Sequence, residues 1–353
     1  MRRADEFACS AAIAFGTLSR VYLTFVKPLW ADEIFTLDVA RKSFGEILRV
    51  LAADSGPPLH YLLAKLVLLP FPEPGRGDLL VRALSLAASL LTLPVLVSIG
   101  RRLGSARAGL GAAALFSISP LAADFAAEGR GYALAGLLFL VALRQPRASM
   151  AWARATPQGE ALSRFAIDLA LSFDARGPRL SLLAVLALLL FAALLVVSFR
   201  GPLRPVAAVL ATGLLVLLAA QLATGTLVLP ERTAMPFLPL VSLLLAGAPL
   251  PLSLPVAAAS FLSLAVKLPA SRGTSPSEAL AQALAPAARR GQRICAVGLW
   301  GPELDYRLRA AGVPAPVVLF PSDVAQHRGW YAEGERDDRR YESEAAALVA
   351  RRE

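Results

Sequence analysis

Long apolar runs separated by short basic connections constrain this chain more than any other feature of its 353-residue sequence. Several of these runs reach the roughly 17–25 residues that an α-helix needs to cross a bilayer. Residues 7–27 and 79–99 are two examples, and hydrophobic residues make up 56% of the chain. The pattern predicts an all-α polytopic membrane protein, a helical bundle of about seven to nine membrane helices.

The charge distribution fits a membrane and argues against a nucleic-acid ligand. The chain has 36 Lys and Arg residues against 26 Asp and Glu, and the basic residues mostly occupy connections between apolar runs. Cytoplasmic loops of membrane proteins are enriched in Lys and Arg, which anionic headgroups attract. We therefore expect the lipid bilayer, and no nucleic acid, as a partner. The Arg-heavy, Ala/Leu-rich composition suggests a bacterium and hence the bacterial cytoplasmic membrane.

The basic connections also predict the orientation of the first third of the chain. Residues 7–27 are expected to cross outward from Arg2 and Arg3, leaving 29–56 as an extracytoplasmic loop. Residues 57–71 are apolar but too few to span, which favours a re-entrant or surface-packed helix. The alternative is a full crossing by this segment, which would place the basic stretch RRLGSAR outside, against the charge rule.

The extracytoplasmic loop contains the signature of one short helix. Ser43 and Glu46 have the Ser-x-x-Glu spacing of a capping box at a helix start. Apolar residues follow at helical spacing, namely Phe44, Ile47, Leu48 and Leu51. The spacing predicts an amphipathic helix that lies flat on the membrane surface.

Later apolar runs continue the alternation across the membrane. Residues 180–199, 206–223, 234–250 and 251–266 are each expected to span, whereas 133–143 is too short to cross alone. A polar connection precedes the first of these four runs, and prolines are expected to kink the last two.

From residue 268 the chain is rich in charged residues, as soluble domains are. We therefore expect a transmembrane domain over 1–267 and a small extracytoplasmic α/β segment over 268–353. Within that segment, apolar strands at 294–299 and 316–320 flank a helix over 302–312. It has no glycine-rich phosphate-binding loop, so nucleotide binding is not expected.

Four acidic residues stand out in the extracytoplasmic loop, among them Asp38. Asp32 and Glu33 lie where the first span ends, and Asp54 lies near the loop's end. A carboxylate that is partly desolvated has a raised pKa and can act as a general base near neutral pH. The alternative is that these are solvated loop residues, the commoner situation for acids in loops.

Cations at the expected outer surface are candidates for binding a phosphate. Arg82 begins a span, where an arginine either snorkels to headgroups or binds a phosphate with two hydrogen bonds. Glu128 and Arg130, beside Tyr132, form either a local ion pair or a substrate clamp. Lys65 lies inside an apolar helix, where it either snorkels or faces a cavity.

His60 leaves several roles open. It is a candidate metal ligand, a hydrogen-bond donor to a phosphate, or a helix residue whose hydrogen bonds are made within the protein. With a single histidine nearby, no all-protein metal site is expected, although His60 and a carboxylate could hold a divalent cation loosely. Cys9 lies in the first apolar run and Cys295 in the C-terminal third of the chain, so neither a disulfide nor a metal site is expected from them. If these segments converge, carboxylates and cations meet at the membrane surface, as transfer from a lipid-phosphate donor requires.

Four stretches resemble one family of membrane enzymes. They are WADE at the first loop with DSGPPLHY after it, LLVRALSLAASLLTLPVLVSIGRRLG, ISPLAADFAAEGRGYAL and ERTAMPFLPLVSLLLAGA. In this order they resemble the GT-C type membrane glycosyltransferases, in particular the protein O-mannosyltransferase and aminoarabinose transferase group. The resemblance is dense over about residues 7–143 and loose beyond.

The resemblance implies a polyprenyl-phosphate-linked sugar donor, often mannose-like, and an extracytoplasmic acceptor that is a protein, lipid or glycan. It implies that Asp32 is the catalytic base with Glu33 beside it, and that Arg82 and Arg130 bind the donor phosphate. His60 and Glu128 would line the site, and Asp54, Tyr132 and Lys65 are further candidate substrate-binding residues. Attack by an acceptor hydroxyl would invert the anomeric carbon.

The sequence departs from the family pattern in three places. Gly56 replaces the usual histidine before Pro-Pro, and Thr233 replaces a tyrosine. The chain also reaches its polar connection after residue 144 without the two or three further spans that the family usually has. Two alternatives therefore remain beside the enzyme: a non-catalytic scaffold or lipid-binding relative, and a transporter. A transporter is disfavoured because the charges lie at span ends and not at the bilayer midplane.

Overall fold

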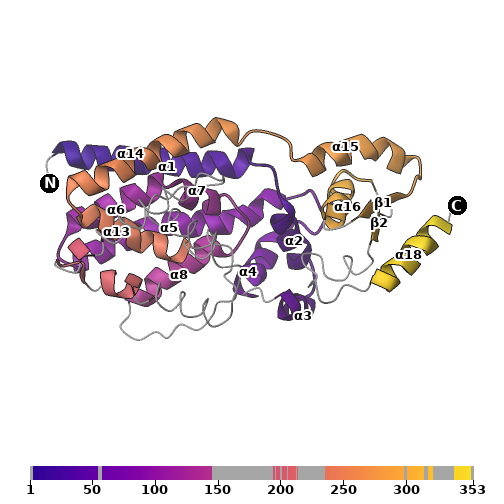
Figure 1. Ribbon diagram of the computed structural model, residues 1–353, viewed down its shortest axis with the longest axis horizontal. Helices are drawn as coiled ribbons and strands as arrows, with labels where there is room; N and C mark the ends of the chain where they lie inside the picture. The colour runs from indigo at the N-terminus through magenta and orange to yellow at the C-terminus, as the bar shows by residue number, and fades with distance from the viewer. Residues whose placement is uncertain are drawn as a thin grey trace. The chain divides into compact units, whose positions relative to one another are not determined.

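The computed structural model describes residues 3–54, 58–144, 194, 196–198, 201–204, 206–211, 213, 235–297, 300–313, 317–320 and 338–350. Within these ranges the chain is almost entirely helical (Figure 1). Tertiary contacts divide it into two compact units. The first, called here the helical unit, comprises Met1–Val26, Ser85–Glu128 and Tyr132–Ser271. The second, the mixed unit, comprises Lys27–Leu84, Gly129–Gly131 and Arg272–Glu353.

This division differs from the expected one. The boundary near residue 272 lies close to the expected change at 268, but Lys27–Leu84 groups with the C-terminal segment and not with the membrane helices. The expected loop over 29–56 is also largely helical, because it contains both α2 (Ala31–Ala40) and α3 (Phe44–Asp54).

Apolar helices make up the helical unit. They are α1 (Arg3–Val26), α5 (Val81–Arg102), α6 (Ala106–Ile118), α7 (Pro120–Ala126), α8 (Tyr132–Arg144), η2 (Met235–Phe237), α13 (Leu238–Gly247) and α14 (Leu250–Ala270). The first turn of α5 belongs to the mixed unit. The core of the helical unit is formed by side chains such as Phe116, Leu140 and Leu244, all fully buried.

Three of the described helices are long and apolar enough to cross a membrane: Arg3–Val26, Asp78–Arg102 and Ser253–Ala270. The pair α6 and α7 would be a fourth if its two halves, bent by 69° at their junction, are counted as one broken span. The chain therefore has the features of a helical membrane protein. The predicted spans 180–199 and 206–223 lie largely outside the described residues, which include only 194, 196–198, 206–211 and 213 of them.

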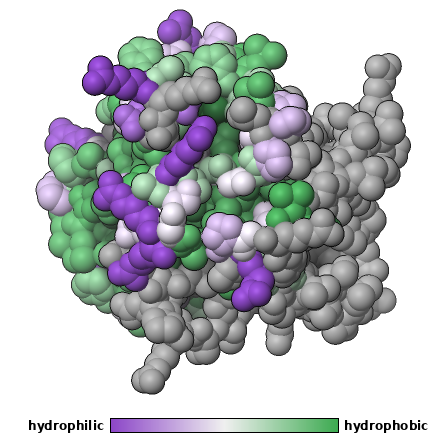
Figure 2. Space-filling model, turned by 90° about the vertical axis from the view of Figure 1, so that its left-hand side faces the viewer, coloured by the Kyte–Doolittle hydropathy of each residue, from purple (hydrophilic) through white to green (hydrophobic). Residues whose placement is uncertain are grey.

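Two contacts, an ion pair and a close approach of a glycine, show that α1 and α6 run in the same direction. Near their N-termini, Asp5 and Arg107 form an ion pair of 3.2 Å. Farther along, Gly16 in the middle of α1 lies so close to the Ser117 carbonyl, near the end of α6, that a Cβ on Gly16 would clash with the oxygen. Figure 2 views the end that holds the α1 N-terminus, where hydrophilic side chains stand among hydrophobic ones.

The junction of α6 and α7 is stabilised by a buried cation that the sequence reasoning missed. Pro120 begins α7 and Ser119 caps it, so the carbonyls of Phe116 and Ser117 lie at a helix break. Arg20, from α1, donates to both carbonyls, with 2.7 Å between its Nη2 and the Phe116 oxygen. Its Nε also donates to Ser89 Oγ at 3.0 Å. Arg20 is only 1% exposed, and it closes the carbonyl end of α6 with positive charge.

The N-terminal part of the mixed unit contains α2, α3, α4 (Pro58–Leu68) and η1 (Asp78–Leu80), and α4 packs on both α2 and α3. The capping box before α3 is confirmed: the Ser43 amide donates to Glu46 Oε2 at 2.9 Å. Helix α4 is an apolar helix shorter than a span, as the length of the segment 57–71 predicts. Whether either helix lies at a membrane surface stays a prediction.

The C-terminal part confirms the expected α/β character. It contains α15 (Pro276–Arg289), β1 (Ile294–Val297), α16 (Trp300–Ala310), β2 (Val317–Phe320) and α18 (Asp338–Ala350). Strands β1 and β2 pair in parallel, with Ile294 opposite Val317, and α16 connects them. Ser275 caps α15 through the Glu278 amide, as a Ser-Pro start predicts. Helix α16 packs on α2.

Candidate functional site

A buried ion pair in the mixed unit anchors the first turn of α2. Glu33 and Arg82 meet in a bidentate pair, with 2.7 Å from Arg82 Nε to Glu33 Oε1 and 2.7 Å from Nη2 to Oε2. Both side chains have 0% exposure. The Gly129 amide donates a further hydrogen bond of 2.8 Å to Glu33 Oε1. Glu33 therefore connects α2, the start of α5 and the segment Gly129–Gly131.

Arg82 uses its remaining donors within the protein. Its Nη1 donates to the Lys27 carbonyl at 2.8 Å, and its Nη2 donates to the Pro28 carbonyl at 3.1 Å. At least four of the five guanidinium N–H groups are thus directed at protein oxygens. In this geometry Arg82 is a structural cation that holds the chain entering α2.

Asp32, one residue before Glu33, presents its carboxylate to a different partner. Arg130 Nη2 lies 3.6 Å from Asp32 Oδ2, and the two side chains are 14% and 15% exposed. Arg130 Nη1 also donates to the Tyr61 hydroxyl at 2.9 Å. Asp32 lies in the first turn of α2, where the helix dipole favours a negative charge. A carboxylate and a guanidinium thus meet in a partly exposed position of the mixed unit.

Two glycines explain how Arg130 reaches this place. A Cβ on Gly129 would come within 2.4 Å of a Val81 methyl group, and a Cβ on Gly131 would come within 3.2 Å of the His60 Cβ. The segment therefore passes between α4 and the start of α5 only because both neighbours of Arg130 lack side chains. The Gly-Arg-Gly pattern is a sequence signal that could have indicated this close approach.

His60 lies against this segment and is 2% exposed. Neither ring nitrogen has a hydrogen-bond partner among the described residues. Burial lowers the pKa of His60 to about 4. A contact with the Gly129 backbone, too poor in geometry to count as a hydrogen bond, acts against this shift, and the charge of Arg130 acts with it. The imidazole is therefore neutral near pH 7, able to donate one hydrogen bond and accept another.

Lys65 has a local explanation. Its Nζ donates to the Lys42 carbonyl at 2.6 Å and lies 5.3 Å from the centre of the Phe44 ring. Lys65 thus fastens α4 to the turn between α2 and α3, and its cost inside an apolar helix is offset by these contacts.

The other predicted site residues are not brought into this group. The Asp54 side chain lies outside the described residues, although its backbone ends α3. Glu128 and Tyr132 belong to the helical unit, where the Tyr132 ring packs against Phe125 at 4.9 Å between centroids. Tyr61 was missed as a candidate, although it directly follows His60 in the sequence.

No group of three or more His, Cys, Asp or Glu side chains that could hold a metal ion occurs among the residues the structure describes. Around the Gly129–Gly131 segment, Asp32 and Arg130 are partly exposed, whereas Tyr61 and His60 are buried beside them. Chemically, they offer an ionised carboxylate that can take a proton, a cation, a phenol and a neutral imidazole.

Similarity to known proteins does not identify this arrangement. No protein-family model matches the chain, and searches of curated proteins and of solved structures found no match.

Proposed function

We propose that the chain is a membrane glycosyltransferase that moves a sugar from a polyprenyl-phosphate donor to an extracytoplasmic acceptor. The observation that carries this proposal is the meeting of Asp32 with Arg130, which are 98 residues apart, in a partly exposed position. A carboxylate beside a cation is what transfer of a sugar from a phosphate needs. The resemblance of the four sequence stretches to the GT-C group supports the same reaction.

The geometry favours Arg130 over Arg82 as the residue that binds the donor phosphate. Arg82 has no exposed surface and is bonded to Glu33 and to two carbonyls. Arg130 is partly exposed and shares its guanidinium between Asp32 and Tyr61. Glu33 and Arg82 then act as positioning residues, because they fix the helix turn that presents Asp32.

In the proposed step, an acceptor hydroxyl attacks the anomeric carbon from the face opposite the phosphate. The new bond joins the acceptor oxygen to this carbon, and the bond from the carbon to the phosphate oxygen breaks. Asp32 takes the hydroxyl proton, and the leaving phosphate keeps the electron pair. Arg130 stabilises the charge that develops on the phosphate, and the sugar configuration inverts.

The site belongs on the extracytoplasmic side in this proposal. Asp32 follows α1 directly, and α1 would cross outward from a basic N-terminus. The donor would approach from the bacterial cytoplasmic membrane, with the protein embedded by several spans beyond the three apolar helices of span length among the described residues.

The experiment compares three versions of the full chain in membranes supplied with radiolabelled polyprenyl-phosphate sugars. The wild type is expected to release the lipid carrier and label an acceptor, and Asp32→Asn is expected to lower this rate by about a hundredfold or more. Asp38→Asn is the control, because Asp38 lies on the same helix but pairs with Lys42 and Arg309. It should keep wild-type activity.

Two results would count against the enzyme. Absence of transfer by the wild type with every sugar tested would favour a non-catalytic membrane protein. Equal loss in the Asp32 and Asp38 variants would indicate a general structural effect and not loss of a base.

A further inference from the structure

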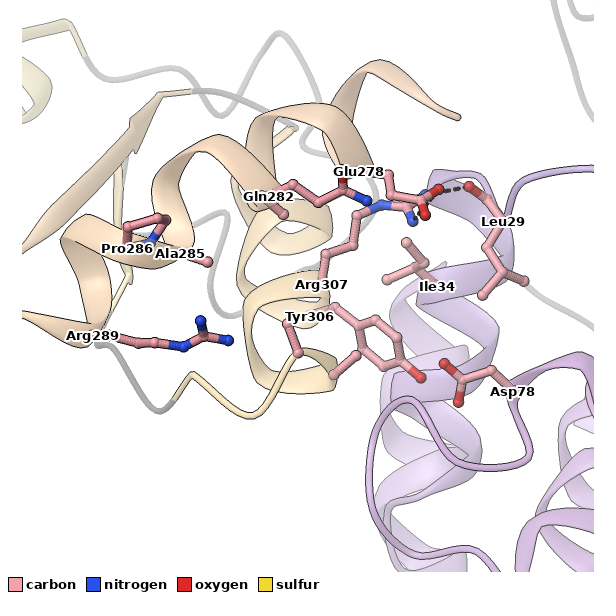
Figure 3. Close-up of a pocket in the computed structure, with 13 residues that line it drawn as sticks. Leu29, Ile34, Asp78, Glu278, Gln282, Ala285, Pro286, Arg289, Tyr306 and Arg307 are labelled. Carbon is pink, nitrogen blue, oxygen red and sulfur yellow. Dashed lines mark hydrogen bonds and ion pairs between the residues drawn. The ribbon is translucent and has the colours of Figure 1, made fainter. Parts of the chain in front are cut away.

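A cavity in the mixed unit lies apart from the side chains assigned to the transferase site. It has a volume of about 450 Å³, within the range of small-molecule binding sites. Figure 3 shows that helices α15 and α16 form much of its wall, together with Leu29, Ile34 and Asp78. Much of the lining is apolar, including Ile34, Ala285 and Ala310.

Most charges on the cavity wall are already balanced by neighbours. Asp78 accepts a 2.8 Å bond from Arg41, which also donates to the Tyr306 hydroxyl. Glu278 lies 3.7 Å from Arg307, but Arg307 is closer to Glu303, at 3.0 Å. The end of the cavity near Glu278 therefore carries no surplus positive charge.

Arg289 differs from these residues. It lines the cavity, is exposed, and has no ion-pair or hydrogen-bond partner among the described residues. Glu278, Gln282, Ala285 and Arg289 recur along α15 at helical spacing, so one face of this helix forms the wall. In Figure 3 the Arg289 guanidinium extends toward the cavity, opposite the end where Glu278 lies. Among the described residues that line the cavity, Arg289 is therefore the cation without a counter-charge, and a ligand with a negative group would meet it here.

We propose that this cavity binds a small organic carboxylate with an apolar or aromatic body. Arg289 would hold the carboxylate with two parallel hydrogen bonds, a geometry that guanidinium and carboxylate groups share. The body of the ligand would lie against Ile34 and Ala285. A doubly charged phosphate fits less well, because one guanidinium balances only one of its two charges.

Binding is tested on the detergent-purified full chain by thermal unfolding, with three probes of similar size: benzoate, phenyl phosphate and benzyl alcohol. Benzoate is expected to raise the unfolding temperature in a saturable manner, because a ligand that binds only the folded state stabilises it. Phenyl phosphate should bind more weakly, and the neutral alcohol should give no saturable rise.

Two variants connect the effect to the cavity. Arg289→Ala is expected to weaken benzoate binding about ten- to a hundredfold, the usual loss for a charge-assisted pair. Arg290→Ala is the matched control, since Arg290 is the next residue, is equally exposed and does not line the cavity. Ala311→Trp fills the cavity from an exposed position and should also abolish binding.

The proposal is overturned if benzoate gives no saturable rise, if it binds Arg289→Ala as tightly as wild type, or if the Trp variant still binds. Tighter binding of phenyl phosphate than of benzoate would overturn the preference for a carboxylate. The cavity would bind such a ligand whether or not Asp32 takes part in sugar transfer, so the two experiments can fail independently.

Discussion

Arg82 and Glu33 face each other through two bonds of 2.7 Å in a place that no solvent reaches. A buried pair of this kind gains little over a well-packed apolar core, but losing one partner leaves the other as an isolated buried charge. The pair therefore fixes the position of the α2 start, and with it the direction of Asp32.

Glu33→Gln should destabilise the folded protein by about 3–5 kcal/mol, because Arg82 is left buried without a counter-charge. Urea unfolding of the purified protein, followed by tryptophan fluorescence, measures the change. Glu73→Gln is the control: the Glu73 carboxylate is 68% exposed and pairs with an exposed arginine, so its loss should have little effect. Equal unfolding midpoints for wild type and Glu33→Gln would contradict the structural role given to the pair.

Arg20→Met should destabilise the protein by about 1–3 kcal/mol, because the Ser117 carbonyl at the helix break loses its donor. Arg20→Lys should recover only part of the loss, since an ammonium lacks the planar fork that reaches several oxygens at once. Thermal unfolding in detergent measures both variants. Arg101→Met, an exposed change in α5, serves as the reference. A full recovery by lysine would mean that charge alone, and not the fork, supports the break.

His60 should make the folded protein less stable as the pH falls. Its pKa is lowered from 6.5 to about 4 in the folded chain, so the unfolded chain binds the proton first. Above pH 6.5 His60 is neutral in both the folded and the unfolded chain, so this contribution to stability is fully present. As the pH falls from 6.5 through about 4, the free energy of unfolding decreases by about 3 kcal/mol. Urea unfolding of wild type and His60→Phe at pH 7, 5.5 and 4 checks this. The variant should lack this part of the pH dependence, and identical profiles would refute the prediction.

Tyr306→Phe should cost about 1–2 kcal/mol and loosen the attachment of α16 to α2. The buried hydroxyl accepts a 2.8 Å bond from Arg41, and burial raises the pKa of Tyr306. The ring itself stays, so its contact with the Arg41 guanidinium at 5.8 Å is kept. A double-mutant cycle with Arg41→Gln should show non-additive losses. Faster protease cleavage within the C-terminal segment is the second readout, and additive losses would show that the two side chains act separately.

Local sequence signals predicted local structure well. Ser43 with Glu46 marked the start of α3, because a cap depends on residues within one turn. The length of the segment 57–71 predicted a helix too short to span. Helix α2 was missed because its acids suggested a solvated loop, although acids in a first turn favour a helix.

Ion pairs between residues far apart in the sequence could not be predicted in the same way. The sequence marked Asp32, Glu33, Arg82 and Arg130 as important but could not say which carboxylate pairs with which arginine. Glu33 and Arg82 are 49 residues apart, and the choice depends on the depth at which each side chain lies. Arg20 passed unnoticed because an arginine in an apolar run near a chain end is usually taken to lie at the headgroups.

Arg20 also has a consequence for the order in which the chain is made. Its carbonyl partners at Phe116 and Ser117 lie 96 and 97 residues downstream, so they do not yet exist when α1 leaves the ribosome. An unpartnered arginine inside a span costs about 2.5–3.5 kcal/mol at the helix centre. Until α6 and α7 are synthesised, the Gly16 carbonyl of its own helix is the backbone partner that Arg20 already has. We therefore expect α1 to reach its final position only after the broken helix formed by α6 and α7 has been made.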